Sequence, residues 1–327
     1  MKKTIYLYKS GELTRKDHSL LFSSQDEDFY IPVEQVDMIV VFCELTLNKR
    51  VLALLNEYEI VVLFFSFHGN YIGRYSPKKY SDGKLIVNQV NAYQSAERLK
   101  TARTMIDSEI RNVLSFVKYY NKKLNCFDKE ITGITECLGE VEYIETVELL
   151  MLKEAEVKKI YYSTFDRVIG NKEFHFGARG INPPSNEVNA MLSYGYALLY
   201  SCVLSDIDRS PLIPQLSFIH SLSKESDSLH FDIADILKPV FIDRLVMRMI
   251  NRNQVNPEHF EHRNGGVYLT KEGTKVFIEE YEKLMAKPVL IGKKYYSYRN
   301  IVTREVYALA NYLSGKNKSY NPFVMRW

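Results

Sequence analysis

The sequence contains little cysteine, and the few cysteines it has are far apart. Only four occur in 327 residues, and no two of them form a CxxC pair. A zinc knuckle or a disulfide-stapled scaffold is therefore not predicted. The chain also lacks an N-terminal apolar run of signal-peptide length and any stretch long enough to span a membrane. We accordingly expect a reduced, cytoplasmic protein.

A strong charge of one sign is absent as well. The formal net charge is +3, so the overall charge says little about which partners the protein binds. No internal repeat and no low-complexity tract is present. Tyrosine, in contrast, is abundant, with 24 residues against a single tryptophan. Tyrosine can stack on bases and hydrogen-bond phosphates, although most tyrosines are ordinary core and interface residues.

The length allows two domains, and the hydrophobic pattern changes once along the chain. Residues 1–85 contain short runs rich in Val, Ile, Phe and Tyr between turn residues, which predicts strands at Thr4–Tyr8, Ser19–Phe22, Asp28–Pro32, Asp37–Phe42 and Ile60–Phe67. After a polar linker at Ser76–Gly83, apolar residues recur at helical spacing. The expected helices are a long one over residues 92–124 and then Val141–Phe165, Glu187–Leu204, Ile233–Asn251, Thr270–Met285 and Val302–Leu313. We therefore predict an α+β protein with a β-rich domain at 1–85 and a mainly α-helical domain at 86–327.

The helix expected around residue 150 carries a carboxylate in an unusual position. Val147, Leu150, Val157 and Tyr161 define an apolar stripe, and Glu154 lies on that same stripe. Burying a carboxylate without a partner costs several kcal/mol, so such a position points to a cation or a hydrogen-bond partner. From the helix alone, a glutamate at the edge of the stripe that reaches solvent or a lysine is the simpler interpretation.

A second acidic pattern follows the segment that ends at His220. Asp232 and Asp235 are three residues apart, so in a helix they share one face, where two like charges repel unless a cation lies near them. Acidic residues that complement the dipole of a first helical turn are the competing explanation. His220 ends an apolar run, where a hydrogen-bonded core histidine is the common case, and His230 is a nearby competitor.

Taken together, these side chains offer a coherent set of metal ligands. Glu, His and Asp supply the oxygen and imidazole donors that suit Mn²⁺ or Mg²⁺. A divalent ion in such a site can polarise a phosphodiester and activate water or a 3′-hydroxyl. The spacing alone does not establish that the three segments meet in the fold.

The same residues carry a resemblance to the Cas-one family of CRISPR spacer-acquisition proteins. In that family the catalytic glutamate lies in a helical motif, G-[IL]-E-G-x-A-A-R-x-Y-[FW], and the matching stretch here is Leu152–Tyr162. Glu154 falls on the catalytic position, Lys159 on the basic one and Tyr161 on the aromatic one. Both glycines of the motif are absent, with Lys153 and Ala155 on either side of Glu154.

Further motifs follow in the order that the family has them. Its G-F-x-H segment and D-x-x-[DE] helix start correspond to Ser217–His220, with serine in place of glycine, and to Asp232–Asp235. His220 and Asp232 match the family's metal ligands, and Asp235 matches the second acidic position. The helix Asn189–Leu199, preceded by Arg179 and by Pro183-Pro184, resembles the family's asparagine-containing helix, and the opening strands resemble the branch found with type I-B systems.

The resemblance implies an N-terminal β-domain used for dimerisation and a C-terminal helical catalytic domain. It implies a metal-dependent DNA endonuclease and integrase of antiviral defence, which inserts captured spacer DNA into a CRISPR array by transesterification. The implied cofactor is Mg²⁺ or Mn²⁺, and the implied partners are double-stranded and branched DNA, a second copy of the chain and the small Cas-two protein. The implied catalytic residues are Glu154, His220, Asp232 and Asp235, of which Glu154, His220 and Asp232 would hold the metal.

Two other functions remain open at this point. One is a nucleic-acid-binding scaffold of the same adaptation complex, in which the acidic residues are structural and no metal binds. The other is an unrelated helical protein whose β-domain binds a partner.

The C-terminal segment is basic and rich in tyrosine. From Ala286 onward, eight Lys and Arg residues face a single acid, Glu305, and tyrosines interleave with them. Basic side chains contact phosphates and tyrosines stack on splayed bases, which predicts a DNA surface. We expect its contacts at Lys293, Lys294, Arg299 and Arg304, with Arg179 as a further one. A solvated tail whose tyrosines pack on the helical domain is the equal alternative.

Overall fold

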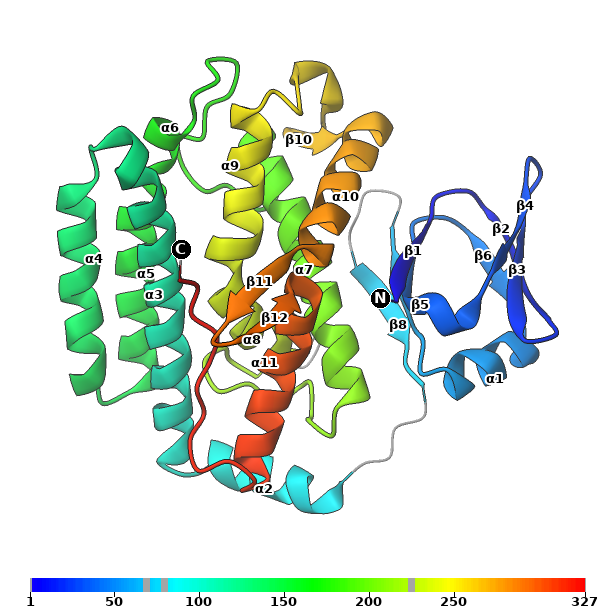
Figure 1. The fold of residues 1–327 in the computed structure, drawn as a ribbon, viewed down its shortest axis with the longest axis horizontal. Coiled ribbons are helices and arrows are strands. Elements are labelled where there is room, and N and C mark those ends of the chain that lie inside the picture. The colour runs from blue at the N-terminus through cyan, green and yellow to red at the C-terminus, as the bar shows by residue number, and fades with distance from the viewer. Residues whose placement is uncertain (1, 67–70, 78–81, 223–226, 327) are drawn as a thin grey trace. The chain divides into compact units, whose positions relative to one another are not determined.

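The computed structural model describes residues 2–66, 71–77, 82–222 and 227–326 (Figure 1). Contacts between backbone segments divide the chain into two compact units. The first unit comprises Met1–Ile86 together with Leu204–Leu212, and the second comprises Val87–Val203 together with Ile213–Trp327. A short segment from the middle of the sequence therefore belongs to the N-terminal unit, which the hydrophobic pattern did not indicate.

Two four-stranded sheets make up most of the first unit. One has the order β1-β5-β7-β8, with β8 antiparallel and the others parallel, and its strands are Lys3–Leu7, Val36–Val41, Val61–Phe65 and Tyr71–Tyr75. The other has the order β4-β3-β2-β6, with strands Asp28–Ile31, Ser19–Ser23, Gly11–Lys16 and Leu45–Leu47. The helix α1 (Lys49–Glu57), which begins at the capping side chain of Asn48, contributes Val51, Leu54 and Leu55 to the apolar core of this unit.

Within the first unit, ion pairs join the last residues of the long helix α7 (Glu187–Arg209) to the strands β8 and β5. The Arg74 Nε lies 2.5 Å from Asp208 Oδ2, and the Arg209 Nη1 lies 3.0 Å from Asp37 Oδ1. In composition and length α7 is also the one helix of the described residues that could cross a membrane, but 78% of its apolar window is buried inside the protein. Such burial is typical of the core helix of a globular domain.

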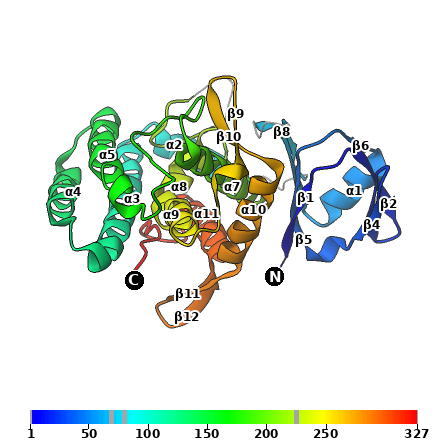
Figure 2. The same ribbon diagram turned by 90° about the horizontal axis from the view of Figure 1, so that it is seen from above.

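The second unit is built from packed helices. The helices α3 (Glu97–Leu124), α4 (Asp128–Glu140) and α5 (Val147–Tyr162) lie side by side, and α3 also contacts α8 (Leu229–Lys238) (Figures 1 and 2). The remaining helices are α2 (Gly83–Tyr93), α6 (Phe165–Val168), α9 (Arg244–Asn251), α10 (Lys271–Ala286) and α11 (Tyr298–Leu313). A π-helical turn at Pro239–Asp243 joins α8 to α9.

Local capping explains where the key helices begin. The side-chain oxygen of Thr146 accepts a hydrogen bond from the backbone N–H of Leu149 at the start of α5. Ser297 caps α11 in the same way through the backbone N–H of Asn300. These caps satisfy backbone donors that the first helical turn leaves without partners.

Two β-hairpins interrupt the helices of the second unit. The strands β9 (Phe260–Arg263) and β10 (Gly266–Leu269) form one, and β11 (Pro288–Ile291) and β12 (Lys294–Ser297) form the other. Figure 2 shows the second hairpin extending away from the ends of α10 and α11.

The described structure confirms the predicted fold class, with a β-rich N-terminal region followed by a mostly helical part. Several elements differ from the sequence prediction: β2, β8, α4 and both hairpins were not expected, and the long helix over Val141–Phe165 is divided into a 3₁₀ turn, α5 and α6. In the predicted linker, residues 78–81 lie outside the described residues, as do Phe67 and Trp327, and α2 already begins at Gly83.

Hydrogen bonds to a buried asparagine hold the C-terminal segment around residues 323–325 in place. The Asn112 Nδ2 donates to the carbonyl oxygen of Phe323 over 2.9 Å, and the backbone N–H of Met325 donates to Asn112 Oδ1 over 2.8 Å. Because Asn112 is fully buried on α3, these hydrogen bonds fix the C-terminal segment on the helical unit.

Candidate metal centre

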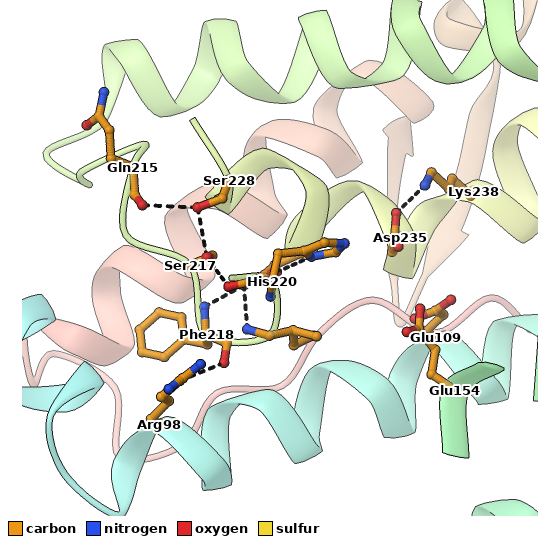
Figure 3. A network of polar contacts seen from close by, with 12 residues as sticks. Arg98, Glu109, Glu154, Gln215, Ser217, Phe218, His220, Ser228, Asp235 and Lys238 are labelled. Carbon is orange, nitrogen blue, oxygen red and sulfur yellow. Dashed lines mark hydrogen bonds and ion pairs between the residues drawn. The ribbon is translucent and has the colours of Figure 1, made fainter. Parts of the chain in front are cut away.

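Three carboxylates from three different helices converge in the second unit. Glu109 of α3, Glu154 of α5 and Asp235 of α8 each offer an oxygen, and these oxygens all lie within 4.8 Å of one another. Figure 3 shows Glu109 and Glu154 side by side with Asp235 close to them. Glu109 and Asp235 are buried and Glu154 is partly buried, so a dense negative charge is held away from bulk water.

Two lysines compensate this charge. Lys158, one turn after Glu154 on α5, forms an ion pair with Glu154 and places its Nζ 3.4 Å from both Glu109 Oε1 and Asp235 Oδ2. Lys238, one turn after Asp235 on α8, forms an ion pair with Asp235. Residues three or four positions apart lie on the same face of a helix. Lys158 therefore shares a face with Glu154 on α5, and Lys238 shares a face with Asp235 on α8.

Burial and the neighbouring charges shift the pKa values of the clustered carboxyls in opposite directions. Burial raises the pKa of the Glu109 carboxyl well above its usual range; Lys158 opposes the shift, while Glu154 and Asp235 reinforce it. Burial also acts to raise the pKa of Asp235, but Lys238, Lys158 and His220 outweigh it and hold that pKa below its usual value. The cluster therefore contains an ionised Asp235 beside a glutamate that favours its protonated form.

His220 and Asp232 form a separate, directly bonded pair. The His220 Nδ1 lies 2.7 Å from Asp232 Oδ1, and Asp232 is completely buried. Asp232 also accepts three backbone hydrogen bonds, from the N–H groups of Phe218 at 2.6 Å, Ile219 at 3.1 Å and His220 at 3.2 Å. Both oxygens of Asp232 are thus engaged in holding the loop and orienting the imidazole ring.

Further hydrogen bonds fix the loop that carries His220. The Ser217 Oγ donates to the carbonyl oxygen of His220 over 2.7 Å, and the Arg98 Nε donates to the carbonyl oxygen of Phe218 over 3.2 Å (Figure 3). With Nδ1 bonded to a carboxylate, Nε2 is the ring nitrogen left to bind a ligand. Burial acts to lower the pKa of His220, but the hydrogen bond to Asp232 and the charges of Asp232, Asp235 and Glu154 raise it.

The structure distributes the four predicted site residues over these two groups. Glu154 and Asp235 lie together in the carboxylate cluster, whereas His220 and Asp232 are bonded to each other, and neither of these two belongs to the cluster found among the described residues. The family resemblance gave Asp232 the role of metal ligand and placed Asp235 at the second acidic position. In the structure both oxygens of Asp232 accept hydrogen bonds, whereas Asp235 shares its cluster with Glu154 and faces two lysines. His230, the competing histidine, is buried against the rings of Tyr200 and Phe231.

Glu109 was missed by the sequence analysis. It lies on the buried face of α3 with Ala102, Ile106, Ile110 and Val113, in the same relation to an apolar stripe as Glu154 on α5. The criterion that drew attention to Glu154 would have selected Glu109 as well.

A second buried network lies beside the cluster. The hydroxyls of Tyr161 and Tyr196 donate to the two carboxylate oxygens of Asp243, over 2.8 and 2.6 Å. Burial raises the pKa of Asp243 to about 6, although the two hydroxyls act to lower it. Asp243 ends the π-helical turn after α8, and such turns are frequent at functional sites.

The predicted DNA contacts differ in exposure. Lys293 and Lys294 are exposed at the turn of the β11–β12 hairpin, and Arg304 is exposed on α11 with its guanidinium 4.1 Å from the ring of Tyr296. Arg179 is half-buried and hydrogen-bonded to Asn189 Oδ1 at 3.0 Å and Ser193 Oγ at 3.0 Å. Arg299 is 9% exposed and donates to Thr303 Oγ1 over 2.8 Å. The expectation that Arg299 lies on a phosphate-binding surface is therefore not supported, because that side chain packs inside the fold.

The sequence of this chain matches a family of known proteins. The model of the family described as CRISPR associated protein Cas1 matches residues 5–283. A CRISPR-associated endonuclease Cas1 of Moorella thermoacetica is 36% identical over 99% of this chain and 100% of its own length. One of Thermodesulfovibrio yellowstonii is 32% identical over the full length of both chains.

Solved structures agree with these sequence matches. A Cas1 protein from Thermotoga maritima superposes with a TM-score of 0.86 at 30% identity, over 99% of this chain and all of its own. A casposase bound to an integration product shares the fold with a TM-score of 0.87 at 19% identity, over 100% of this chain and 95% of its own. Since the family model and the relatives match nearly the whole sequence, the chain belongs to the Cas1 family of CRISPR-associated proteins.

Proposed function

We propose that this protein is a metal-dependent DNA endonuclease and integrase whose divalent ion binds between Glu154, Asp235 and the Nε2 atom of His220. The observation that carries the proposal is that Glu154 and Asp235 come together from separate helices. His220, whose ring is held by Asp232, is close enough for the charges of both acids to raise its pKa. Carboxylate oxygens and an imidazole nitrogen suit Mg²⁺ or Mn²⁺. Glu109 adds a third carboxylate to the same charge cluster.

The residues of the chain have distinct tasks in this proposal. Asp232 holds the imidazole of His220 in one orientation, as carboxylates beside metal-binding histidines commonly do. When bound, a divalent ion would polarise the phosphodiester and activate water or a 3′-hydroxyl. In the integration reaction, the 3′-hydroxyl of the captured DNA would form a bond to the phosphorus at the end of the repeat, as the bond from that phosphorus to the 3′-oxygen of the flanking strand breaks. The proton lost by the attacking hydroxyl would be balanced by the one that the departing 3′-oxygen takes up. One phosphodiester replaces another, so no high-energy cofactor is required.

Relatives support DNA as the substrate. The full-length relatives are named endonucleases, and proteins of the same fold have been solved with DNA, including the casposase on its integration product. In this chain, we propose that Lys293, Lys294, Arg304 and Arg179 contact phosphates. Arg299 is left out because it is buried.

Replacing both Lys293 and Lys294 with alanine tests the DNA surface. We expect weaker DNA binding and a salt dependence whose slope falls by about one for each lost phosphate contact. The matched control replaces Lys122 and Lys129, two exposed lysines of α3 and α4, and removes the same charge. Equal effects of the two double variants would show that the hairpin has no special role in binding DNA.

We further propose an assembly with a second copy of the chain and with the small Cas2 protein. A structural neighbour of 17% identity was solved in a complex with Cas2. We propose that the dimer contact lies in the β-rich domain 1–85 and that residues 86–327 form the catalytic domain. Light scattering at micromolar concentration tests the dimer, because only monomer in solution would contradict it. The assignment to the type I-B branch stays a prediction.

The direct test of the activity is metal removal. Cleavage of branched DNA should stop in EDTA and return when Mn²⁺ is added in excess. DNA binding without cleavage under all metal conditions would instead support the alternative, a non-catalytic nucleic-acid-binding scaffold.

A further inference from the structure

Lys158 has an unusual environment for a lysine next to a proposed metal site. Its ammonium contacts all three carboxylates of the cluster: it pairs with Glu154 and lies 3.4 Å from Glu109 Oε1 and from Asp235 Oδ2. A single Nζ among three carboxylates from three helices takes up the charge-neutralising role that a cation has in such a cluster. In the family motif quoted above, the corresponding position is the second alanine, so this contact comes from a departure of this chain from the motif.

We propose that Lys158 is the resident cation of the carboxylate cluster and that a divalent ion binds there only by displacing its ammonium. This inference rests on the proposed function, because it concerns the same site. An ammonium and a divalent ion compete for the same oxygens, and the like charges repel when both are present. Metal binding is then coupled to a rearrangement of the Lys158 side chain.

Lys238 provides the contrast that makes Lys158 the displaceable lysine. The Nζ of Lys238 contacts only Asp235 among the three carboxylates and lies 4.7 Å and 4.6 Å from the ring centres of Tyr196 and Tyr200. Aromatic faces stabilise a cation that has been removed from water, so Lys238 has partners that a metal would not take away. Its side chain is 14% exposed, against 29% for Lys158.

The Lys158 side chain is the more exposed of the two lysines of the cluster. A lysine stem has several rotatable bonds, so its ammonium can move out of the cluster without repacking the core. Near a bound nucleic acid, the displaced ammonium would meet phosphate oxygens. Displacement by the metal would thus exchange three carboxylate partners for water or a phosphate.

The test measures binding of Mn²⁺ alone, in the absence of DNA, to the full-length protein by calorimetry and by electron paramagnetic resonance of the free ion. Lys158→Ala, which restores the motif residue, should bind Mn²⁺ about tenfold more tightly than the unchanged protein, or tighter still. Lys158→Met removes the charge but keeps most of the stem, and it should show the same gain in Mn²⁺ affinity. This variant provides the measurement if Lys158→Ala does not fold. Lys159→Ala, which removes an equal charge from the exposed neighbour, should leave the affinity unchanged.

A second measurement uses the unchanged protein. Mn²⁺ should increase the labelling of Lys158 by an amine-reactive reagent, read by mass spectrometry, while Lys238 stays protected and Lys159 serves as the internal reference. Unchanged or weaker Mn²⁺ affinity in both Lys158 variants, or labelling of Lys158 that does not respond to Mn²⁺, would overturn the inference and leave the proposed metal site intact. Failure of every protein, including the unchanged one, to bind Mn²⁺ would overturn the proposed function and this inference with it.

Discussion

Asp232 and Asp235 are one helical turn apart on α8, yet their carboxylates meet opposite kinds of partner. Asp232 is held by three backbone N–H groups and the ring of His220. Asp235 meets the ammonium groups of Lys158 and Lys238 and shares a cluster with two glutamates. The spacing that makes the two residues look equivalent in sequence does not determine their roles. Their roles depend on what each carboxylate faces across the fold.

The same contrast extends to the other buried acids of the helical unit. Asp243 is held by two tyrosine hydroxyls, and Glu305 accepts hydrogen bonds from the Tyr320 hydroxyl at 2.7 Å and the backbone N–H of Phe323 at 2.8 Å. Carboxylates with neutral donors fix the backbone and its rings in place. Asp235, which faces two ammonium groups, instead keeps a pKa below its usual value and so retains its charge.

The largest effect is expected from the acids that face cations. Glu154→Gln and Asp235→Asn should each lower the rate of DNA cleavage in Mn²⁺ by about 10³-fold or more, because losing a metal ligand removes several kcal/mol of transition-state stabilisation. A gel assay of single-turnover cleavage measures the rate. Near-normal cleavage by Asp235→Asn would reverse the assignment of the two aspartates.

His220→Ala should also abolish strand transfer, but with a different effect on DNA affinity. Neutral imidazole adds no negative field, so its removal should leave DNA binding largely unchanged. Glu154→Gln and Asp235→Asn each remove a negative charge near the phosphates and should tighten binding slightly. Fluorescence anisotropy separates the two classes. Normal integration by His220→Ala in Mn²⁺ would make His220 structural and His230 the candidate ligand.

Asp232 should matter for stability as well as for activity. Asp232→Ala leaves three backbone N–H groups without their partner, two of them buried and one partly buried. Because each orphaned buried donor costs about 1–3 kcal/mol, the free energy of unfolding should fall by about 3 kcal/mol or more. It should lower activity by about 10–100-fold through the loss of His220 orientation. Asp232→Asn keeps an acceptor oxygen and should recover much of the stability, as measured by urea unfolding. Equal stability of all three proteins would contradict the structural role.

The smallest effect is a pH dependence of stability that arises from an acid with neutral partners. Burial raises the pKa of Glu305 to about 7, so between pH 4.5 and 7 the folded state binds a proton that the unfolded state has released. The free energy of unfolding should therefore fall as the pH rises through this range, by about 2–3 kcal/mol from this group. Glu305→Gln should flatten the curve, whereas Glu258→Gln, at an exposed position, should not.

The sequence carried enough information for the broad architecture and for part of the site. The change near residue 85 from short runs of β-forming residues to helical periodicity corresponds to the change from sheets to helices. The acid on an apolar stripe drew attention to Glu154, which lies in the carboxylate cluster and pairs with Lys158. The β11–β12 hairpin was missed because each of its strands has only four residues. Periodicity cannot resolve runs that short.

The relation between Asp232 and Asp235 could not be predicted from their spacing. The donors that engage Asp232 belong to the backbone of residues 218–220, whose N–H groups point at α8 only after the chain has folded. Likewise, Lys158 faces the cluster because α3, α5 and α8 pack together. Contacts between distant segments determine these roles, and no local pattern contains them.

We propose that the divalent ion binds to Glu154 and Asp235, while Asp232 orients His220, and anomalous diffraction from crystals soaked in Mn²⁺ can locate the ion. We expect one peak bonded to the carboxylates of Glu154 and Asp235 and to His220 Nε2, with Asp232 still bonded to His220 Nδ1. A peak bonded to Asp232 and not to Asp235, or no peak in the cluster at saturating Mn²⁺, would rule out this arrangement.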